Sequence, residues 1–515
     1  MSPFSYLQTA LLLFLLLPII SILIRLRAKK GKPKVPKLKL PPGPSPLPII
    51  GNLYHLGRQP HISLRRLSQR HGPIIHLTLG QIPTVVVSSP RTARDVLRTH
   101  DLALCSRPAL FAARKVFYDC TDIAFAPYGS YWRGLRKLCI LELLSARRVD
   151  SFASARAAET TALVASIVDQ QRRHGSVNLS LALGAYASGV ICRAAFGKDW
   201  AGGGGHERRG FQQMLDEHHI LLGGFSVIDF FPSLEWVNAL TGKRRQLQGT
   251  FSKLSAFLDE VLADHLEKRE SKVLDLVDVL LDAQRDESAE VRLTMDNIKA
   301  VILDMFAAGT DTTFTTLDWA MTELAMNPNA MRAAQQEVRA VVGNRTSVAE
   351  SDLAQLPYMK AVIKETFRLH PPAPLLLPRE SMEAVTIEGY DIPAKTRIFV
   401  NAWAIGRDPK SWEEAEAFVP ERFLGSEVDY KGQNFELLPF GAGRRGCPGL
   451  AFGVVGVEIA LAQMLHSFDW ELPPGTRAED LDLKEDFGLT MHRAQNLVLV
   501  ARPLFVSEVQ PMDEE

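Results

Sequence analysis

One cysteine, Cys447, stands in a local sequence that could hold a reactive thiolate. The segment Phe440–Gly449 contains four glycines, Pro448 follows the cysteine, and an apolar helical pattern covers Leu450–Leu465. Where a turn enters a helix, backbone N–H groups and the positive helix end stabilise a thiolate and lower the cysteine pKa. Because thiolates are strong ligands for iron, this pattern predicts a metal-ligating Cys447. The remaining cysteines lack paired spacing and are expected to be buried and structural: Cys105, Cys120, Cys139 and Cys192.

A second candidate site lies midway along an apolar helical segment, at Ala308-Gly309-Thr310-Asp311-Thr312-Thr313. Glycine and clustered hydroxyls weaken a helix, so some other role should compensate for them. Side-chain hydroxyls can open the local hydrogen-bond ladder and leave a groove with polar groups pointing into it. Since Ser or Thr inside a helix is usually structural, the segment predicts chemistry only together with a metal at Cys447.

The cysteine loop carries a resemblance to a known family. Phe440, Gly443, Arg445, Cys447 and Gly449 fit the pattern F-x-x-G-x-R-x-C-x-G, which resembles the haem-binding loop of cytochromes P450. Three further segments occur in the order and spacing of that family: Ala308–Thr313, Glu365–Arg368 and Pro420–Phe423. The resemblance extends from the proline-rich segment 41–52 to about Pro503, and Lys364–Pro371 is similar to the plant microsomal group.

The resemblance implies a cofactor and the residues that bind it. The cofactor is haem b, with Cys447 as the ligand of its iron. Thr312 is expected to organise water and protons near dioxygen, and Asp311 to supply protons to that relay. The residues expected to hold the haem propionates are Trp132, Arg136, Arg379 and Arg445, and Phe440 is expected to contact the haem.

Two of these motifs are weak without the family context. Trp132 and Arg136 are one helical turn apart and could together bind one carboxylate. Glu365 and Arg368 have i, i+3 spacing, which usually gives an exposed ion pair of little energy. The resemblance instead implies that both residues, together with Arg422, form a buried ionic lock beneath the haem.

The elements that must position these residues are mostly helices. Helical periodicity is expected over Phe251–Glu270, Met295–Met326 and Met359–Leu369. Strands are expected as a hairpin of Ile74–Leu79 with Thr84–Val87, and more weakly at Ala384–Ile392 and Arg397–Val400. Gly202–Gly205 predicts a mobile exposed loop. The predicted fold class is mainly α with small β-sheets, and the resemblance implies a cytochrome P450 fold with a single N-terminal transmembrane helix.

The N-terminus predicts a membrane anchor. Leu7–Ile24 is almost uninterrupted apolar sequence, close to the roughly 20 residues that a spanning helix needs. Basic residues follow it, and the positive-inside rule keeps them in the cytosol. A cleaved signal peptide is the alternative, but there the charge precedes the apolar core. The predicted organisation is an anchor with its basic flank (1–30), a basic, proline-rich hinge (31–52) and a haem-thiolate catalytic domain (53–515) facing the cytosol at the endoplasmic reticulum membrane.

Composition restricts the partners. The formal net charge is +1 over 515 residues, so no global field would recruit nucleic acid. The sequence contains no convincing flavin or nicotinamide fingerprint, so electrons are expected from another protein. The resemblance implies that this donor is an NADPH-cytochrome P450 reductase. Arg133, Lys137 and Arg444 are the hypothesised docking face for that reductase on the thiolate side of the haem.

The predicted function is insertion of one oxygen atom of dioxygen into a small to medium hydrophobic plant specialised metabolite, either terpenoid, phenolic or indolic. The resemblance implies a pocket lined by Val116–Phe125, Phe306, Ala307, Ala373–Leu377 and Phe487–Leu489. The alternatives are a haem-thiolate enzyme that rearranges hydroperoxides without a reductase and a non-catalytic haem-binding protein. The Asp311–Thr312 pair argues against both, because neither needs an oxygen-linked proton relay.

Overall fold

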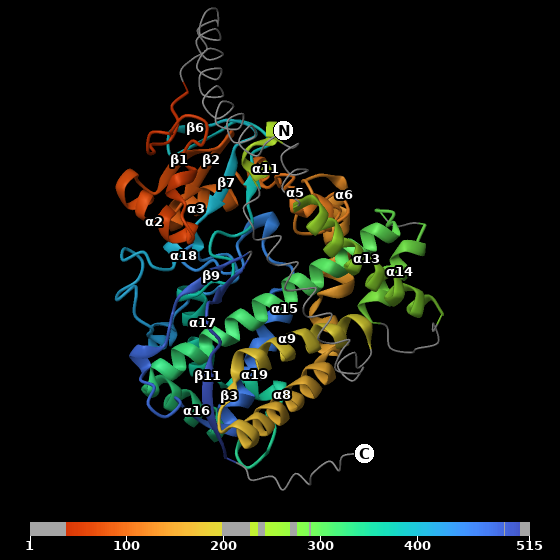
Figure 1. Ribbon diagram of the computed structural model, residues 1–515, viewed down its shortest axis with the longest axis vertical. Helices are drawn as coiled ribbons and strands as arrows, with labels where there is room; N and C mark the ends of the chain where they lie inside the picture. Colours follow the sequence, from red (N-terminus) through yellow and green to blue (C-terminus); the bar gives the residue numbers. More distant parts are fainter. Residues whose placement is uncertain are drawn as a thin grey trace, which may run out of the picture.

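The computed structural model describes residues 38–197, 227–234, 243–267, 275–287, 290–488 and 490–504. Its described part consists of a large helical region and a smaller region with sheets at one end (Figure 1). The predicted anchor (1–30), the first part of the hinge and the Gly202–Gly205 loop lie outside the described residues.

Helices dominate the described part of the chain. They are α2 (Pro60–His71), α3 (Pro90–Arg94), α4 (Asp101–Leu104), α5 (Phe111–Val116), α6 (Ser130–Leu138), α7 (Ala146–Ser151), α8 (Ala153–His174), α9 (Leu179–Phe196), α11 (Val227–Phe230), α13 (Lys243–Glu267), α14 (Leu276–Arg285), α15 (Met295–Met326), α16 (Pro328–Val342), α17 (Pro357–Leu369), α18 (Ala402–Ile405) and α19 (Leu450–Ser467). The prediction of a mainly helical fold is confirmed. The bounds of α15 are those expected, whereas α13 begins at Lys243 and α17 at Pro357, before the predicted starts.

The strands are short and form small sheets. They are β1 (Ile74–Leu79), β2 (Ile82–Val87), β3 (Val177–Asn178), β4 (Arg379–Glu380), β5 (Val385–Ile387), β6 (Tyr390–Ile392), β7 (Arg397–Val400), β8 (Phe468–Glu471), β9 (Glu485–Phe487), β10 (Met491–Arg493) and β11 (Val498–Pro503). The largest sheet has the order β1-β2-β7-β4, with β2 parallel to β7 and the other pairs antiparallel. The predicted hairpin is its β1–β2 pair, and β4 carries Arg379 at its edge.

Helix α15 is the long helix that crosses the helical region (Figure 1). A capping box fixes its start, because Asn297 N–H donates to Thr294 Oγ1 at 3.2 Å and Thr294 N–H donates to Asn297 Oδ1 at 2.9 Å. The helix packs against α9, α17 and α19. A Cβ at Gly309 would lie 2.4 Å from Ile191 Cδ1 of α9, so glycine permits this close approach. The packing compensates for the low helix propensity of this segment.

Two described helices, α9 and α19, are long and apolar enough to cross a membrane by length and composition. Most of each lies inside the molecule, with 78% of α9 and 67% of α19 buried. Both are therefore core helices, and they hold the hydrophobic cluster that also includes α8, α16 and α17. This cluster supports one side of the site described next.

Candidate functional site

A cavity of about 300 Å³ gathers most of the residues that the sequence predicted for the site. Its lining includes residues of α15, of the cysteine loop and of the segment between α17 and β4. The predicted site residues at its lining are Arg136, Asp311, Thr312, Arg379, Phe440, Arg445 and Cys447. Trp132 lies behind the lining, packed against Arg445 and Arg136.

The cysteine loop is a tight backbone structure that presents the thiol to the cavity. Cys447 N–H donates to Phe440 O at 2.9 Å, and Gly446 N–H donates to Gly443 O at 3.0 Å. Gly443 has φ +70°, and a Cβ there would lie 2.2 Å from Leu97 O, so the position requires glycine. Gly449 precedes the first residue of α19. The loop and the helix start therefore have the arrangement that the glycine and proline spacing predicts.

The electrostatics of the thiol differ from the prediction. Cys447 is accessible because it faces the cavity, yet the cavity is deep, and burial raises the pKa of Cys447 above its ordinary value. The Gly449 N–H and the Arg136 guanidinium lower that pKa but do not outweigh burial. For the protein without a bound metal, the prediction of a lowered Cys447 pKa was wrong. It considered the favourable dipoles of the loop but not the desolvation of the thiolate.

Four arginines make one wall of the cavity cationic: Arg107, Arg136, Arg379 and Arg445. Among the residues that the structure describes, only Arg379 of the four pairs with a carboxylate, at 2.7 Å from Asp101 Oδ1. Arg445 Nε donates to Cys105 O at 2.8 Å, and Arg107 Nη1 donates to Leu377 O at 2.7 Å. Burial, followed by repulsion from the neighbouring arginines, lowers the pKa of Arg445 to about 10. A wall with this excess of positive charge fits a ligand with carboxylates.

Trp132 has a different contact from the one expected. Its indole N–H donates to Ile123 O at 2.9 Å, so it is already satisfied within the protein. The Arg445 guanidinium lies 3.8 Å from the centre of the indole ring and the Arg136 guanidinium 5.4 Å from it. Trp132 therefore holds the two arginines in place by cation–π contact. Phe440 lies edge-on to Phe367 of α17, with ring centroids 5.1 Å apart.

The predicted ionic lock is confirmed in position and burial. Arg368 Nε and Nη2 each donate to a Glu365 oxygen at 2.7 Å, and both side chains are fully buried. Arg422 Nε lies 3.1 Å from Glu365 Oε1. Arg368 also donates to Gly406 O and Ala415 O, so the lock joins α17 to the chain that follows α18.

The two predicted catalytic residues lie side by side on α15 but differ in their contacts. The Thr312 hydroxyl donates to Ala308 O at 2.6 Å, one turn back along the helix. The helix remains continuous from Met295 to Met326, so the hydroxyls do not interrupt it. Asp311 accepts a hydrogen bond from the Thr490 hydroxyl and pairs with His492 at 3.0 Å. The sequence had singled out neither Thr490 nor His492.

Comparison with known proteins assigns the family. Residues 41–500 match the family model described as cytochrome P450. The chain is 62% identical over 473 residues to cytochrome P450 71AP13 of Prunus mume, covering 91% of each, and 48% identical to strychnine-11-hydroxylase of Strychnos nux-vomica, covering 98% of each. A structure of zebrafish cytochrome P450 with abiraterone is similar, with 28% identity, a TM-score of 0.73 and coverage of 87% of this chain and 99% of that chain.

This chain belongs to the cytochrome P450 family. It is a monooxygenase of the plant A-type group, as the cysteine loop and its companion motifs predicted. Membership implies a haem with a cysteine thiolate as iron ligand. The described cavity suits that group, because a cysteine and a cationic wall border the same space.

The P450 pocket differs from the prediction at Phe306, which faces the core. Phe306 is only 1% exposed and stacks on Phe196 of α9, with centroids 4.9 Å apart. Val116 is likewise packed in that apolar cluster. Phe117, Ile123–Phe125, Ala307, Ala373, Leu376 and Leu377 do line the cavity. Leu489 and the side chain of Phe487 lie outside the described residues.

A buried pair of acids beside the cavity was not predicted. Asp304 of α15 accepts from Ile123 N–H at 2.6 Å and from Ala124 N–H at 3.1 Å, which ties the loop before α6 to α15. Burial raises the pKa of Asp304 to about 6, and burial together with the Asp304 charge raises the pKa of Asp122. No local sequence signal marks Asp304 or Arg107, because most of their partners are distant in the chain.

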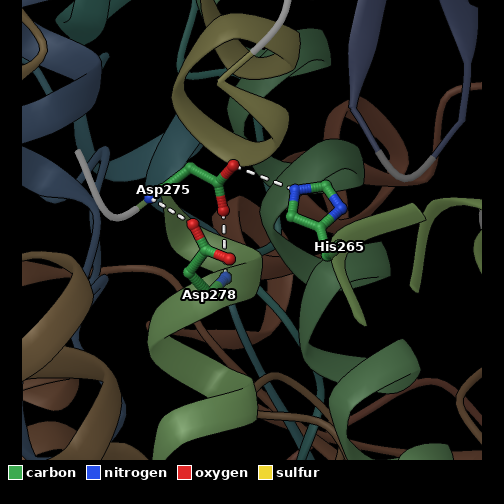
Figure 2. A group of neighbouring side chains, drawn as sticks. All are labelled: His265, Asp275 and Asp278. Atoms are coloured by element: carbon green, nitrogen blue, oxygen red, sulfur yellow. Dashed lines mark hydrogen bonds and ion pairs between the residues drawn. The ribbon is translucent and has the colours of Figure 1, made fainter. Parts of the chain in front are cut away.

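A histidine and two aspartates form a second polar group, shown in Figure 2, far from the thiol in sequence. Asp275 caps α14: its Oδ1 accepts from Asp278 N–H at 3.0 Å, and Asp278 Oδ2 accepts from Asp275 N–H at 3.3 Å. His265 Nε2 lies 2.9 Å from Asp275 Oδ2, and Nδ1 lies 2.7 Å from Val261 O. These bonds account for the group as a helix cap that links α13 to α14, with no need of a metal ion.

The three basic residues proposed for reductase docking have unequal surroundings. Lys137 pairs with Glu290 at 2.7 Å, and Arg444 pairs with Asp101 at 3.1 Å. Arg133 lies over the Tyr128 ring, 5.8 Å from its centroid. Two of the three positive charges are therefore partly neutralised, so the positive potential of the docking face is weaker than the sequence predicted.

Proposed function

We propose that the cavity holds haem b with Cys447 as the ligand of its iron and with Arg136, Arg379 and Arg445 against the propionates. The main support is that Cys447 and four arginines border the same cavity. Among the described residues, only one of these arginines, Arg379, is paired with a carboxylate. Arg107 joins this set because it is buried and donates all its described hydrogen bonds to backbone carbonyls. Two propionates would supply the negative charge that this wall lacks.

When bound, haem b supplies dioxygen activation, which an axial thiolate favours. The chain's own residues then have separate tasks. Thr312 would orient water with its hydroxyl, and Asp311 would pass protons into the cavity. Trp132 would keep Arg445 and Arg136 in place, and Phe440 would pack against the haem from the cysteine loop. An NADPH-cytochrome P450 reductase would take electrons from NADPH and transfer them to this enzyme.

The proposed substrate is a small to medium hydrophobic plant metabolite of the terpenoid, phenolic or indolic class. The cavity lining is mainly apolar, with Phe117, Phe125 and Leu377 among its side chains. A relative named as strychnine-11-hydroxylase supports hydroxylation of a specialised metabolite. We also propose that residues 1–30 anchor the protein in the endoplasmic reticulum membrane, with the catalytic domain in the cytosol.

Reconstitution with a purified plant reductase tests this function. The full chain in lipid vesicles is supplied with NADPH, isotopically labelled dioxygen and a panel of terpenoid, phenolic and indolic compounds. The expected result is a product with one labelled oxygen atom, formed only when reductase and NADPH are present. The proposal would be contradicted if no labelled product formed with reductase and NADPH while a hydroperoxide was converted without reductase. That result would favour the rearranging alternative.

A further inference from the structure

A polar network extends from Asp311 away from the thiol and reaches β10. His492 Nε2 lies 3.0 Å from Asp311 Oδ1, and the Thr490 hydroxyl donates to the other Asp311 oxygen. Thr490 Oγ1 also lies 3.0 Å from His492 Nε2. The second ring nitrogen, Nδ1, lies 3.3 Å from Thr315 Oγ1. Both imidazole nitrogens therefore have polar neighbours, and one neighbour is the carboxylate at the cavity.

His492 lies between that carboxylate and the outside of the molecule. Its side chain is 27% exposed, whereas the Asp311 side chain is 9% exposed. Asp311 and Thr490 line the cavity, whereas His492 is not among its lining residues. The Phe314 ring stacks on the imidazole with centroids 5.4 Å apart and fixes its plane. The imidazole can thus exchange protons on one side and contact Asp311 on the other.

The charges around His492 favour its protonated form. Asp311 and Asp318 face it from α15, and Asp486 lies opposite it in the β9–β10 pair. Arg493, its neighbour on β10, is the opposing positive charge. The Asp311 carboxylate, 3.0 Å from Nε2, stabilises an imidazolium, and imidazole is the side chain whose ordinary pKa lies nearest neutrality.

We propose that His492 is a positioning residue of the oxygen-activating relay, which reloads Asp311 with protons from solvent. The inference rests on the proposed function, in which the substrate, dioxygen, two electrons and two protons become the hydroxylated product and water. The Nε2 proton of the imidazolium passes to the Asp311 carboxylate, and Asp311 passes it to water in the cavity. The neutral imidazole regains a proton from solvent. NADPH supplies both electrons through the reductase.

The first test compares His492→Gln with wild type in the reconstituted, haem-loaded enzyme. Glutamine retains hydrogen-bonding groups but cannot titrate. Product per NADPH, hydrogen peroxide and the solvent deuterium isotope effect are measured from acidic to alkaline pH. Wild-type coupling should fall as pH rises and His492 loses its proton. In the variant, coupling near neutrality should be roughly tenfold lower than in wild type and should not depend on pH. This loss is smaller than the ~100-fold loss expected for a group that touches the reacting atoms.

The matched control is His174→Gln, which changes an exposed histidine at the end of α8 and should keep the wild-type profile. If His492→Gln also kept the wild-type pH profile and isotope effect, the proposal would be overturned, although NADPH-dependent product would still support the proposed function. If the wild-type enzyme formed no product at all, the proposed monooxygenase function would be contradicted instead.

A readout independent of turnover tests the contact itself. In the ¹⁵N-histidine-labelled holoenzyme, the NMR signal absent from His492→Gln identifies His492 among the 13 histidines. Its titration midpoint should drop by about one pH unit in Asp311→Asn, because the neutral amide no longer stabilises the imidazolium. An unchanged midpoint would show that Asp311 and His492 are not coupled and would overturn the proposal.

Discussion

At the residue scale, the Thr312 hydroxyl already makes a structural contact beside its proposed catalytic role. Its Oγ1 donates to Ala308 O at 2.6 Å, a local bond that many helical threonines make. Thr322 makes the same bond to Asp318 O at 2.7 Å, farther along α15 and away from the cavity. Local geometry therefore does not distinguish the two threonines, and only the neighbourhood of the cavity does.

We predict that Thr312→Ala keeps the thiolate spectrum but diverts electrons to hydrogen peroxide. Product per NADPH should fall by about 100-fold, the lower end of the contribution of a positioned acid–base group. Thr322→Ala, which removes the same local bond, should leave coupling unchanged. Parallel assays of NADPH, product and peroxide check both variants, and normal coupling in Thr312→Ala would remove its hydroxyl from the relay.

Single residues also show where sequence reasoning stopped. Cys447 and the position of Gly443 followed from the local pattern, because a turn before a helix leaves a signature in neighbouring residues. Arg107 and Asp304 left no such signature, since their partners are backbone groups far along the chain. The direction of the Cys447 pKa was wrong because burial depends on the whole fold.

At the scale of elements, α17 is held to the chain after α18 by buried charges. We predict that Glu365→Gln destabilises the folded protein by ~3–5 kcal/mol, because it strands the Arg368 charge in the interior. The matched control is Asp169→Asn, which breaks an exposed ion pair with Arg173 on α8 and should cost at most ~1 kcal/mol. Thermal unfolding of both variants measures the difference, and equal losses would contradict a structural lock.

The α13–α14 junction should make stability depend on pH. Burial lowers the pKa of His265, but its hydrogen bonds to Asp275 and Val261 outweigh burial and leave the pKa above 6.5. The stabilisation is therefore complete below pH 6.5 and is lost as pH rises through the folded-state pKa. The stability difference between wild type and His265→Gln should be larger at pH 6 than at pH 9. A difference that grew with pH would contradict the assignment.

Elements were predicted best where one periodic pattern decided their structure. The bounds of α15 followed from its apolar periodicity, and the β1–β2 hairpin from two apolar runs around a turn. Phe306 fell on the wrong side of α15, because a helix buried almost all round gives no sequence signal for which face meets a cavity.

The whole molecule combines a buried catalytic cavity with a predicted membrane anchor. We predict that removal of residues 1–30 moves the protein from the membrane fraction to the soluble fraction and leaves the haem spectrum unchanged. The reason is that Leu7–Ile24 is long and apolar enough for a span, whereas α9 and α19, which also have that length and composition, are mostly buried inside the molecule. Membrane fractionation checks this, and a truncated protein still integral to the membrane would show that another segment anchors it.

The most direct test of a haem-thiolate site is the carbon monoxide difference spectrum of the reduced full-length protein, measured beside Cys447→Ala and Cys192→Ala. Cys192 is a buried cysteine outside the cavity lining and serves as the matched control. We predict a red-shifted Soret band in wild type and in Cys192→Ala that is absent from Cys447→Ala. A spectrum typical of haem–histidine ligation in wild type, or a red-shifted band that survives in Cys447→Ala, would contradict the account.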